Sequence, residues 1–141
     1  MTRMWVMLLL GAAVGGLLLR DDAVLHVGLD MSISQVRMRY DQLLDEADAL
    51  AAALQAHGIA KGDRVALAMR NYPEWMAAFV AIVSIGAVVV PVNSWGQPAD
   101  VAFTVEDAGA RLVICDQQRY DGISARMGDQ GIHALIARPT D

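Results

Sequence analysis

The chain has 141 residues, a length that suits one compact domain and argues against a two-domain enzyme. It is 55% hydrophobic and 19% charged, which excludes a disordered linker. The net charge is -5 and no lysine or arginine cluster occurs, so we expect no nucleic-acid partner.

An uncharged apolar run, MWVMLLLGAAVGGLLL, occupies residues 4–19 between Arg3 and Arg20. As a helix it would be about 24 Å long, which is short of the roughly 30 Å hydrocarbon core of a bilayer. The charged sequence RDD follows directly, so a signal-peptide cleavage site is poorly supported. We expect residues 1–22 to form an apolar N-terminal helix, and three interpretations stay open. It is a short transmembrane anchor or signal-like helix, a helix buried against the domain or a partner, or a stretch that is not native to an intact ancestor of the chain. The first would place the protein at a membrane, and the others are compatible with the cytoplasm.

A β-hairpin and an amphipathic helix are predicted next. Segments 23–29 and 35–40 form the two strands, because apolar and polar residues alternate in the second of them. Over residues 41–56, leucine and alanine recur at helical spacing, and Gly58 supplies a left-handed stop. The opposite face of this helix carries Asp41, Asp45 and Asp48, which we interpret as a solvated surface rather than a catalytic carboxylate pair.

The rest of the chain alternates short apolar segments with helical patterns. Strands are predicted at 64–69, 87–92, 111–116 and 132–138, and helices at 73–85, 98–108 and 117–127. The helix at 73–85 is apolar nearly all round, so we expect it to be buried on more than one side. The run at 87–92 is typical of an interior parallel strand. This alternation predicts an α/β layered domain over residues 23–141, with a mostly parallel sheet and right-handed βαβ crossovers.

Cysteine and histidine offer little chemistry. The single cysteine, Cys115, lies in the apolar run LVIC, so we interpret it as a buried packing thiol in a reducing compartment. His26, His57 and His133 are far apart in the sequence and show no metal-ligand spacing. We therefore expect no metal site.

Four short segments carry a more specific pattern. They are residues 38–43 (MRYDQL), 58–66 (GIAKGDRVA), 71–75 (NYPEW) and 83–93 (VSIGAVVVPVN). In order and spacing they resemble the N-terminal part of the AMP-binding, or adenylate-forming, synthetase and ligase superfamily, and within it fatty-acyl-CoA ligases. The first and last segments are similar to its core motifs LTYxEL and LKAGxxxVPxN/D. The resemblance extends over residues 36–138 and implies the fold of a partial N-terminal α/β subdomain.

The resemblance also implies an activity for an intact member of the family. Such an enzyme activates a carboxylic acid with ATP to an acyl-adenylate and then transfers the acyl group to coenzyme A, with magnesium assisting. The Ser/Thr/Gly-rich loop for the ATP phosphates, the ribose-binding Asp and the catalytic Lys have no counterpart in this sequence. Lys61 matches a surface turn and is no substitute for that Lys.

The departures define what we expect of the site. Arg39 and Gln42 stand where the family has a hydroxyl N-cap and its Glu partner, so a cap typically worth about 1 kcal/mol is absent. We expect no catalytic, cofactor-binding or metal-binding residue in this chain. Asn93 and Trp95, in the loop after the last motif, are the alternative candidates for substrate contact in a whole enzyme. Trp5 and Trp75 are interpreted as packing or interface anchors.

One function is expected and two alternatives stay open. We expect a truncated N-terminal fragment of an AMP-forming fatty-acid-type CoA ligase, inactive alone and without a cofactor of its own. The alternatives are a membrane-tethered α/β interaction module anchored through residues 4–19, and a complementing half of a split ligase. The partner would be the missing remainder of a ligase or another polypeptide.

Overall fold

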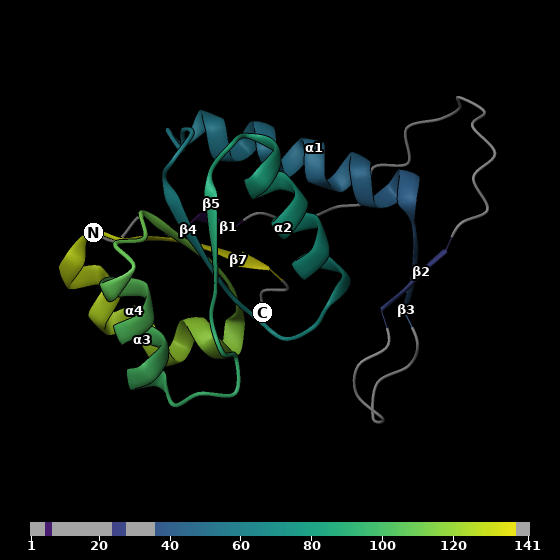
Figure 1. Cartoon of the computed structure of the whole chain (residues 1–141). Coiled ribbons are helices and arrows are strands. Elements are labelled where there is room, and N and C mark those ends of the chain that lie inside the picture. The colour runs from purple at the N-terminus through teal and green to yellow at the C-terminus, as the bar shows by residue number, and fades with distance from the viewer. Residues whose placement is uncertain (1–4, 7–23, 28–35, 138–141) are drawn as a thin grey trace.

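The computed structural model describes residues 5–6, 24–27 and 36–137. Figure 1 shows a twisted sheet with helices on both faces and a separate two-stranded hairpin beside the start of the first helix. This layered α/β arrangement confirms the predicted fold class. The elements in chain order are β1 (Trp5–Val6), β2 (Val24–Val27), β3 (Val36–Arg39), α1 (Tyr40–Ala56), β4 (Arg64–Ala68), α2 (Pro73–Ser84), β5 (Val88–Pro91), α3 (Pro98–Asp107), β6 (Leu112–Asp116), α4 (Gln117–Gln130) and β7 (His133–Ala137).

The main sheet has five strands in the order β1-β7-β6-β4-β5, and every neighbouring pair in it is parallel. β6 lies between β4 and β7, and all five of its residues are buried. β4 is the other central strand, with Val65 paired to Leu112 on one side and to Val89 on the other. β2 and β3 form the antiparallel hairpin that the alternating pattern predicts.

Strand alternation divides the core into two layers. Val65 and Leu67 of β4 face the side covered by α1 and α2, and Ala66 and Ala68 face the side covered by α3 and α4. On the first side they meet side chains such as Leu54 of α1 and Ile82 of α2, which are at most 1% exposed. On the second side the corresponding side chains are Val105 of α3 and Ile123 of α4.

Helix α1 follows the sequence prediction closely. Leu43, Ala47, Leu50, Ala51 and Leu54 are buried, and the three aspartates of the opposite face are exposed. One of the two hydrogen bonds of a capping box is present, because the Arg39 backbone N–H donates to Gln42 Oε1 at 3.0 Å. The helix ends where Gly58 takes a φ of +80°, a conformation that glycine adopts without strain.

Two expectations about α2 and β5 are wrong. α2 buries one face, through residues such as Ala78 and Ile82, while Val83 on another face is 45% exposed. β5 lies at the edge of the sheet, where its first residue, Val88, is 48% exposed. The physical reason is the same in both cases, since no element among the described residues covers this side of the molecule.

Most of the apolar run at residues 4–19 lies outside the described residues. Trp5 and Val6 are described, and they form β1, which pairs in parallel with β7, rather than part of a helix. Within the described part of the chain, no helix is both long enough and apolar enough to cross a membrane. The domain boundary at residue 22 stays a prediction.

Candidate functional site

The sheet has a topological switch point beside β4. From β4 the chain passes to β5 on one side and then returns to β6 on the other side. In open α/β sheets, ligands bind outside the carboxyl ends of the strands at such a point. Three segments meet there in this chain, namely Arg70 after β4, the loop 93–97 after β5, and Asp116 at the end of β6.

Asp116 is the polar centre of this region. Its carboxylate is 7% exposed and accepts the Arg70 backbone N–H at 3.1 Å and the Arg119 backbone N–H at 3.0 Å. The second of these bonds makes Asp116 the N-cap of α4. The Arg119 guanidinium, itself 9% exposed, lies 3.3 Å from the same carboxylate. One buried ion pair therefore joins the ends of β4 and β6 to the start of α4.

Arg119 also holds the loop that follows β5. Its Nε and Nη2 atoms donate to the Ser94 carbonyl oxygen at 2.9 and 2.7 Å. Its Nη1 atom donates to Gln118 Oε1 at 2.9 Å. Because the guanidinium is planar and all three of its nitrogens are engaged, the position of the loop relative to α4 is fixed.

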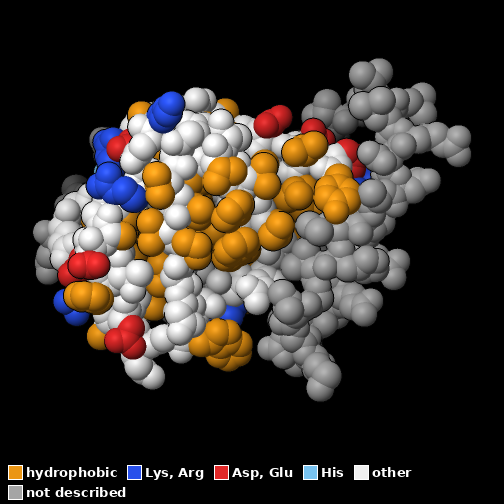
Figure 2. All heavy atoms as spheres, viewed as in Figure 1, with side chains coloured by type: hydrophobic (Ala, Val, Ile, Leu, Met, Phe, Trp, Pro, Cys, Tyr) orange, Lys and Arg blue, Asp and Glu red, His pale blue; other side chains and the backbone are white. Residues whose placement is uncertain are grey.

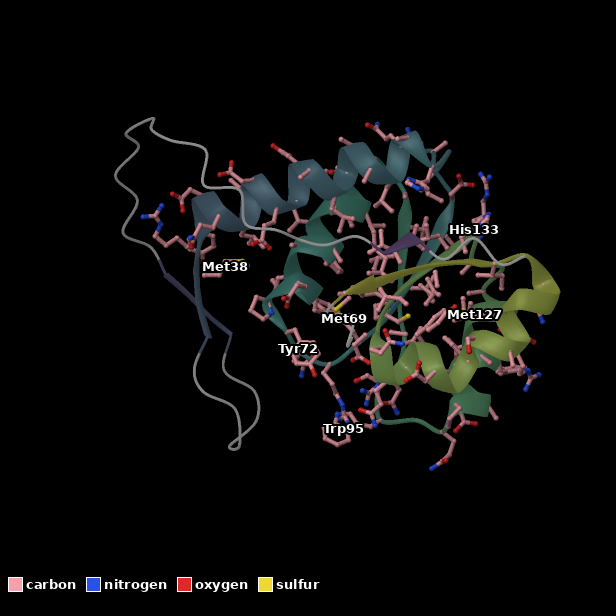
Figure 3. The ribbon with its side chains drawn as sticks, turned by 180° about the vertical axis from the view of Figure 1, so that it is seen from behind. Met38, Met69, Tyr72, Trp95, Met127 and His133 are labelled. Atoms are coloured by element: carbon pink, nitrogen blue, oxygen red, sulfur yellow. The ribbon has the colours of Figure 1, made fainter. Side chains whose placement is uncertain are left out.

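Arg70 and Trp95 form the outer wall of the region. The Arg70 guanidinium lies over the Trp95 ring, 3.1 Å from its centroid, and the indole is 70% exposed. The Nη1 atom of Arg70 is buried and has no hydrogen-bond partner among the described residues. A cavity of about 200 Å³ opens here, with Arg70, Trp95 and Arg119 in its lining. Figure 3 shows Tyr72 and Trp95 together at this end of the molecule, far from His133.

This arrangement suits holding a small anionic group. The lining of the cavity includes Arg70 and Arg119 and no acidic residue, so its charge is positive. The nearest thiol, Cys115, is fully buried, and burial raises its pKa to about 12, with the neighbouring Asp116 and Asp121 acting in the same direction. This confirms Cys115 as a packing residue. The described residues contain no group of three metal-ligating side chains.

A larger hollow lies at the opposite end of the sheet. It has a volume of about 540 Å³ and an apolar floor that includes Leu54, Ile59 and Leu112. Its rim carries His57 and His133, which are distant in the sequence, together with Arg111. Arg111 is already engaged with Asp63, at 2.7 Å. Since this hollow lies at the amino ends of the strands, its position does not match that of ligand sites in this class of sheet.

The structure places the residues singled out from the sequence as follows. Asn93 Oδ1 accepts the Trp95 backbone N–H at 3.1 Å, so both candidates belong to the loop of the cavity. Lys61 is exposed in its turn, far from that loop in the fold. Trp75 stacks on Phe79 with ring centroids 5.5 Å apart and packs against the core. That the chain has no catalytic residue stays a prediction.

Sequence reasoning missed Arg70, Asp116 and Arg119. One signal was available for Asp116, because an aspartate between an apolar strand and a helical pattern is a typical N-cap. No comparable signal existed for the arginines. Arg70 precedes Asp116 by 46 positions, and only the parallel pairing of β4 with β6 brings them together.

Comparisons with known proteins identify the family of the chain. Residues 20–138 match the family described as AMP-binding enzyme. The long-chain-fatty-acid–CoA ligase FadD13 of Mycobacterium tuberculosis is 39% identical over 102 residues, which are 70% of this chain and 20% of the ligase. The chain thus spans about a fifth of this relative's length.

Solved structures give the same result. The N-terminal domain of FACL13 from Mycobacterium tuberculosis superposes with a TM-score of 0.64 at 36% identity, over 72% of this chain and 27% of that one. The anthranilate CoA ligase AuaEII, solved with anthranoyl-AMP, gives a TM-score of 0.67 at 27% identity, over 72% of this chain and 20% of the other. The chain belongs to the AMP-binding enzyme family and corresponds to an N-terminal part of its acyl-CoA ligases.

Proposed function

We propose that this chain is the N-terminal scaffold of an AMP-forming CoA ligase for a fatty-acid-type substrate, and that it makes no acyl-CoA by itself. The observation that carries the proposal is its 39% identity to a long-chain-fatty-acid–CoA ligase, of which it matches only about a fifth. ATP, magnesium and coenzyme A are the co-substrates and metal expected of the intact enzyme.

The described residues do not fit a magnesium-bound triphosphate. A phosphate at a helix N-terminus needs free backbone N–H groups, but Asp116 already occupies that position at α4. The cations at the carboxyl edge, Arg70 and Arg119, are held by Trp95 and by Asp116 with the Ser94 carbonyl. No cluster of metal-ligating side chains occurs in the described part of the chain. We therefore assign no catalytic step to these residues.

This chain can hold a loop in place beside the expected ligand site. The buried Asp116–Arg119 pair fixes the loop 93–97 at the carboxyl edge of the sheet, where a ligand of the whole enzyme would approach. This role supports the proposal that activity needs further protein, because holding a loop lowers no chemical barrier unless the reacting groups are also present.

The first experiment tests inactivity directly. The purified full chain is incubated with ATP, magnesium, coenzyme A and fatty acids of graded length, and acyl-CoA is measured by mass spectrometry. We expect no product above a control without enzyme. Reproducible, enzyme-dependent turnover would contradict the proposal.

A second experiment tests the identity of the scaffold. Residues 36–137 of this chain replace the matching segment of the Mycobacterium tuberculosis ligase, and long-chain acyl-CoA formation is compared with that of the unmodified ligase. We expect a folded chimera with measurable activity, because family members share the fold of this segment. A chimera that folds, shown by a cooperative thermal transition, and yet forms no acyl-CoA would argue against a ligase scaffold.

The complementing half of a split ligase is a second candidate. The exposed apolar side of α2 and β5 favours it over a free-standing module, because a surface of this kind in a soluble domain usually has a partner. Mixing the chain with a polypeptide that carries the rest of a ligase would restore turnover if this function is correct.

A further inference from the structure

One face of the molecule carries an apolar surface that nothing in the described structure covers. Figure 2 shows it as a continuous band of hydrophobic side chains on the side that carries α2 and β5 in Figure 1. We call this surface the α2–β5 face. It is formed by Trp75, Met76, Phe79, Val80, Val83 and Val88.

Helix α2 has the composition of a helix buried on two sides. Its inner face is made of small side chains such as Ala77, Ala78 and Ala81, which are at most 1% exposed and lie against the sheet and α1. Its outer face carries larger apolar side chains, and Glu74 is its single charged residue. A helix at a solvated surface normally carries polar residues there. The largest side chains of α2, Trp75 and Phe79, are thus half-buried, because they pack against the border of the core and leave the rest of their surface uncovered.

Strand β5 shows the same disagreement between sequence and position. The run Val88–Val90 is typical of an interior parallel strand, yet it lies at the edge of the sheet without lysine or another charge to protect it. Val88 is 48% exposed, and Val83, across the turn at the end of α2, is 45% exposed. An exposed valine thus lies on each side of the turn that joins helix α2 to strand β5.

The backbone of β5 indicates how a partner would approach. The N–H groups of Val88 and Val92 donate inward, to the carbonyls of Asp63 at 2.8 Å and Leu67 at 3.0 Å. Alternate residues turn their backbone groups to the same side, so those of Val89 and Pro91 face the outer edge, and Pro91 has no N–H. An added strand would find one outward donor within β5. Packing of apolar side chains, rather than extension of the sheet, is the contact that this face can make.

We propose that the α2–β5 face is the surface on which the remainder of an acyl-CoA ligase packs, through an apolar helix or sheet face of that remainder. The inference rests on the proposed function. It is supported by the length of the relatives, because this chain matches 20% of the ligase FadD13 and 27% of the FACL13 N-terminal domain. In that solved domain the matched part is thus accompanied by more than twice its own length of further protein, which offers a surface for packing. The α2–β5 face suits such packing, because both its helix and its strand have the apolar composition of elements that are buried on two sides.

The test measures association, not catalysis. The full chain is mixed with the part of the Mycobacterium tuberculosis ligase that follows its matched segment, and binding is followed by sedimentation velocity. The test variant is Val83→Glu, and the matched control is Phe103→Glu, because Phe103 is a 62% exposed apolar residue on α3, in the other helix layer. We expect a one-to-one complex that Val83→Glu weakens at least tenfold and Phe103→Glu leaves unchanged.

Three results would overturn the proposal. They are the absence of a complex with the unmodified chain, a Val83→Glu variant that binds as tightly as the unmodified chain, and self-association through this face without binding of the ligase remainder. If Val83→Glu does not fold, hydrogen exchange of the unmodified chain decides instead. The amides of α2 should gain protection on mixing and those of α3 should not, and equal protection in both helices would refute the assignment.

These outcomes separate the docking surface from the proposed function. An active chimera together with no complex would leave the function standing and remove the docking surface. A complex sensitive to Val83→Glu together with an inactive, folded chimera would do the reverse.

Discussion

Replacement of Asp116 should destabilise this chain more than that of any exposed acid. The carboxylate is 7% exposed, accepts the Arg70 and Arg119 backbone N–H groups, and lies 3.3 Å from the Arg119 guanidinium. Asp116→Ala would remove the cap of α4, leave the Arg70 N–H without an acceptor, and deprive a buried guanidinium of its counter-charge. Each of these losses has a known range.

The magnitudes decide the expected size of the effect. Loss of an N-cap costs about 1 kcal/mol, and an unsatisfied buried donor costs about 1–3 kcal/mol. Breaking a buried ion pair from one side costs about 3–5 kcal/mol, but the Ser94 carbonyl and Gln118 Oε1 still accept from Arg119. Since these terms share one carboxylate and do not add, we expect a loss of about 3 kcal/mol for Asp116→Ala. Asp116→Asn keeps the volume and one acceptor oxygen for the cap, but it sets an amide NH2 against the other backbone N–H and removes the counter-charge of Arg119, so about 2 kcal/mol is expected.

Urea unfolding of the full chain, followed by circular dichroism, measures both losses. With a slope of about 2 kcal/mol per molar urea, Asp116→Ala should lower the midpoint by about 1.5 M. Asp121→Ala is the control, because Asp121 lies on the exposed side of the same helix and should stay within about 0.5 kcal/mol of the unmodified chain. A midpoint for Asp116→Ala within that same margin would refute the view that this carboxylate holds the carboxyl edge together.

Further predictions concern the reactivity of the Cys115 thiol, the loss of stability in acid, and the turn at Gly86. Because burial raises the pKa of Cys115 to about 12, iodoacetamide at pH 8 should leave it unmodified in the native chain and alkylate it in urea, and rapid native labelling would contradict its burial. Hydrogen bonding from the Ala60 N–H and the charge of Arg111 lower the pKa of Asp63 below 3.8. Its contribution to stability is therefore present above about pH 3.8 and is lost as pH falls through the lower folded value. Asp63→Asn should reduce the fall of the urea unfolding midpoint in acid. An unchanged fall would show that Asp63 does not contribute to it. Gly86→Ala should cost about 1 kcal/mol, since the residue sits at a φ of +74°, and a thermal melt with no loss would show that the turn relaxes.

Most of the fold follows from local patterns in the sequence. β6 was predictable because the short apolar run LVIC is too short for a helix, and α1 because its leucines and alanines recur at helical spacing. The place of β5 in the sheet was not predictable in this way. A β-branched run indicates burial on both faces, but strand order depends on where the crossovers return, and in this chain α3 carries the chain back past β4.

The candidate site was predictable only in part. The loop with Asn93 and Trp95 stands out because it follows a recognisable motif. Arg70 and Arg119 do not, since an arginine after a strand or in a first helical turn is most often solvated. Their role depends on contacts across the sheet, where Arg119 reaches the Ser94 carbonyl from 25 positions away. Such contacts become visible once the strand order is known.

The α2–β5 face and the cavity at the carboxyl edge are connected through strand β5. This strand forms the edge under the α2–β5 face and runs directly into the loop that carries Trp95. The loop has one anchor at the Ser94 carbonyl and another at the end of β5, where the Val92 N–H bonds to Leu67. A protein surface packed on β5 would restrain the second anchor and leave the first unchanged. The proposed docking at the α2–β5 face would then narrow the range of positions open to Trp95 and, through their stacking, to Arg70, and would so help to set the geometry of the carboxyl edge.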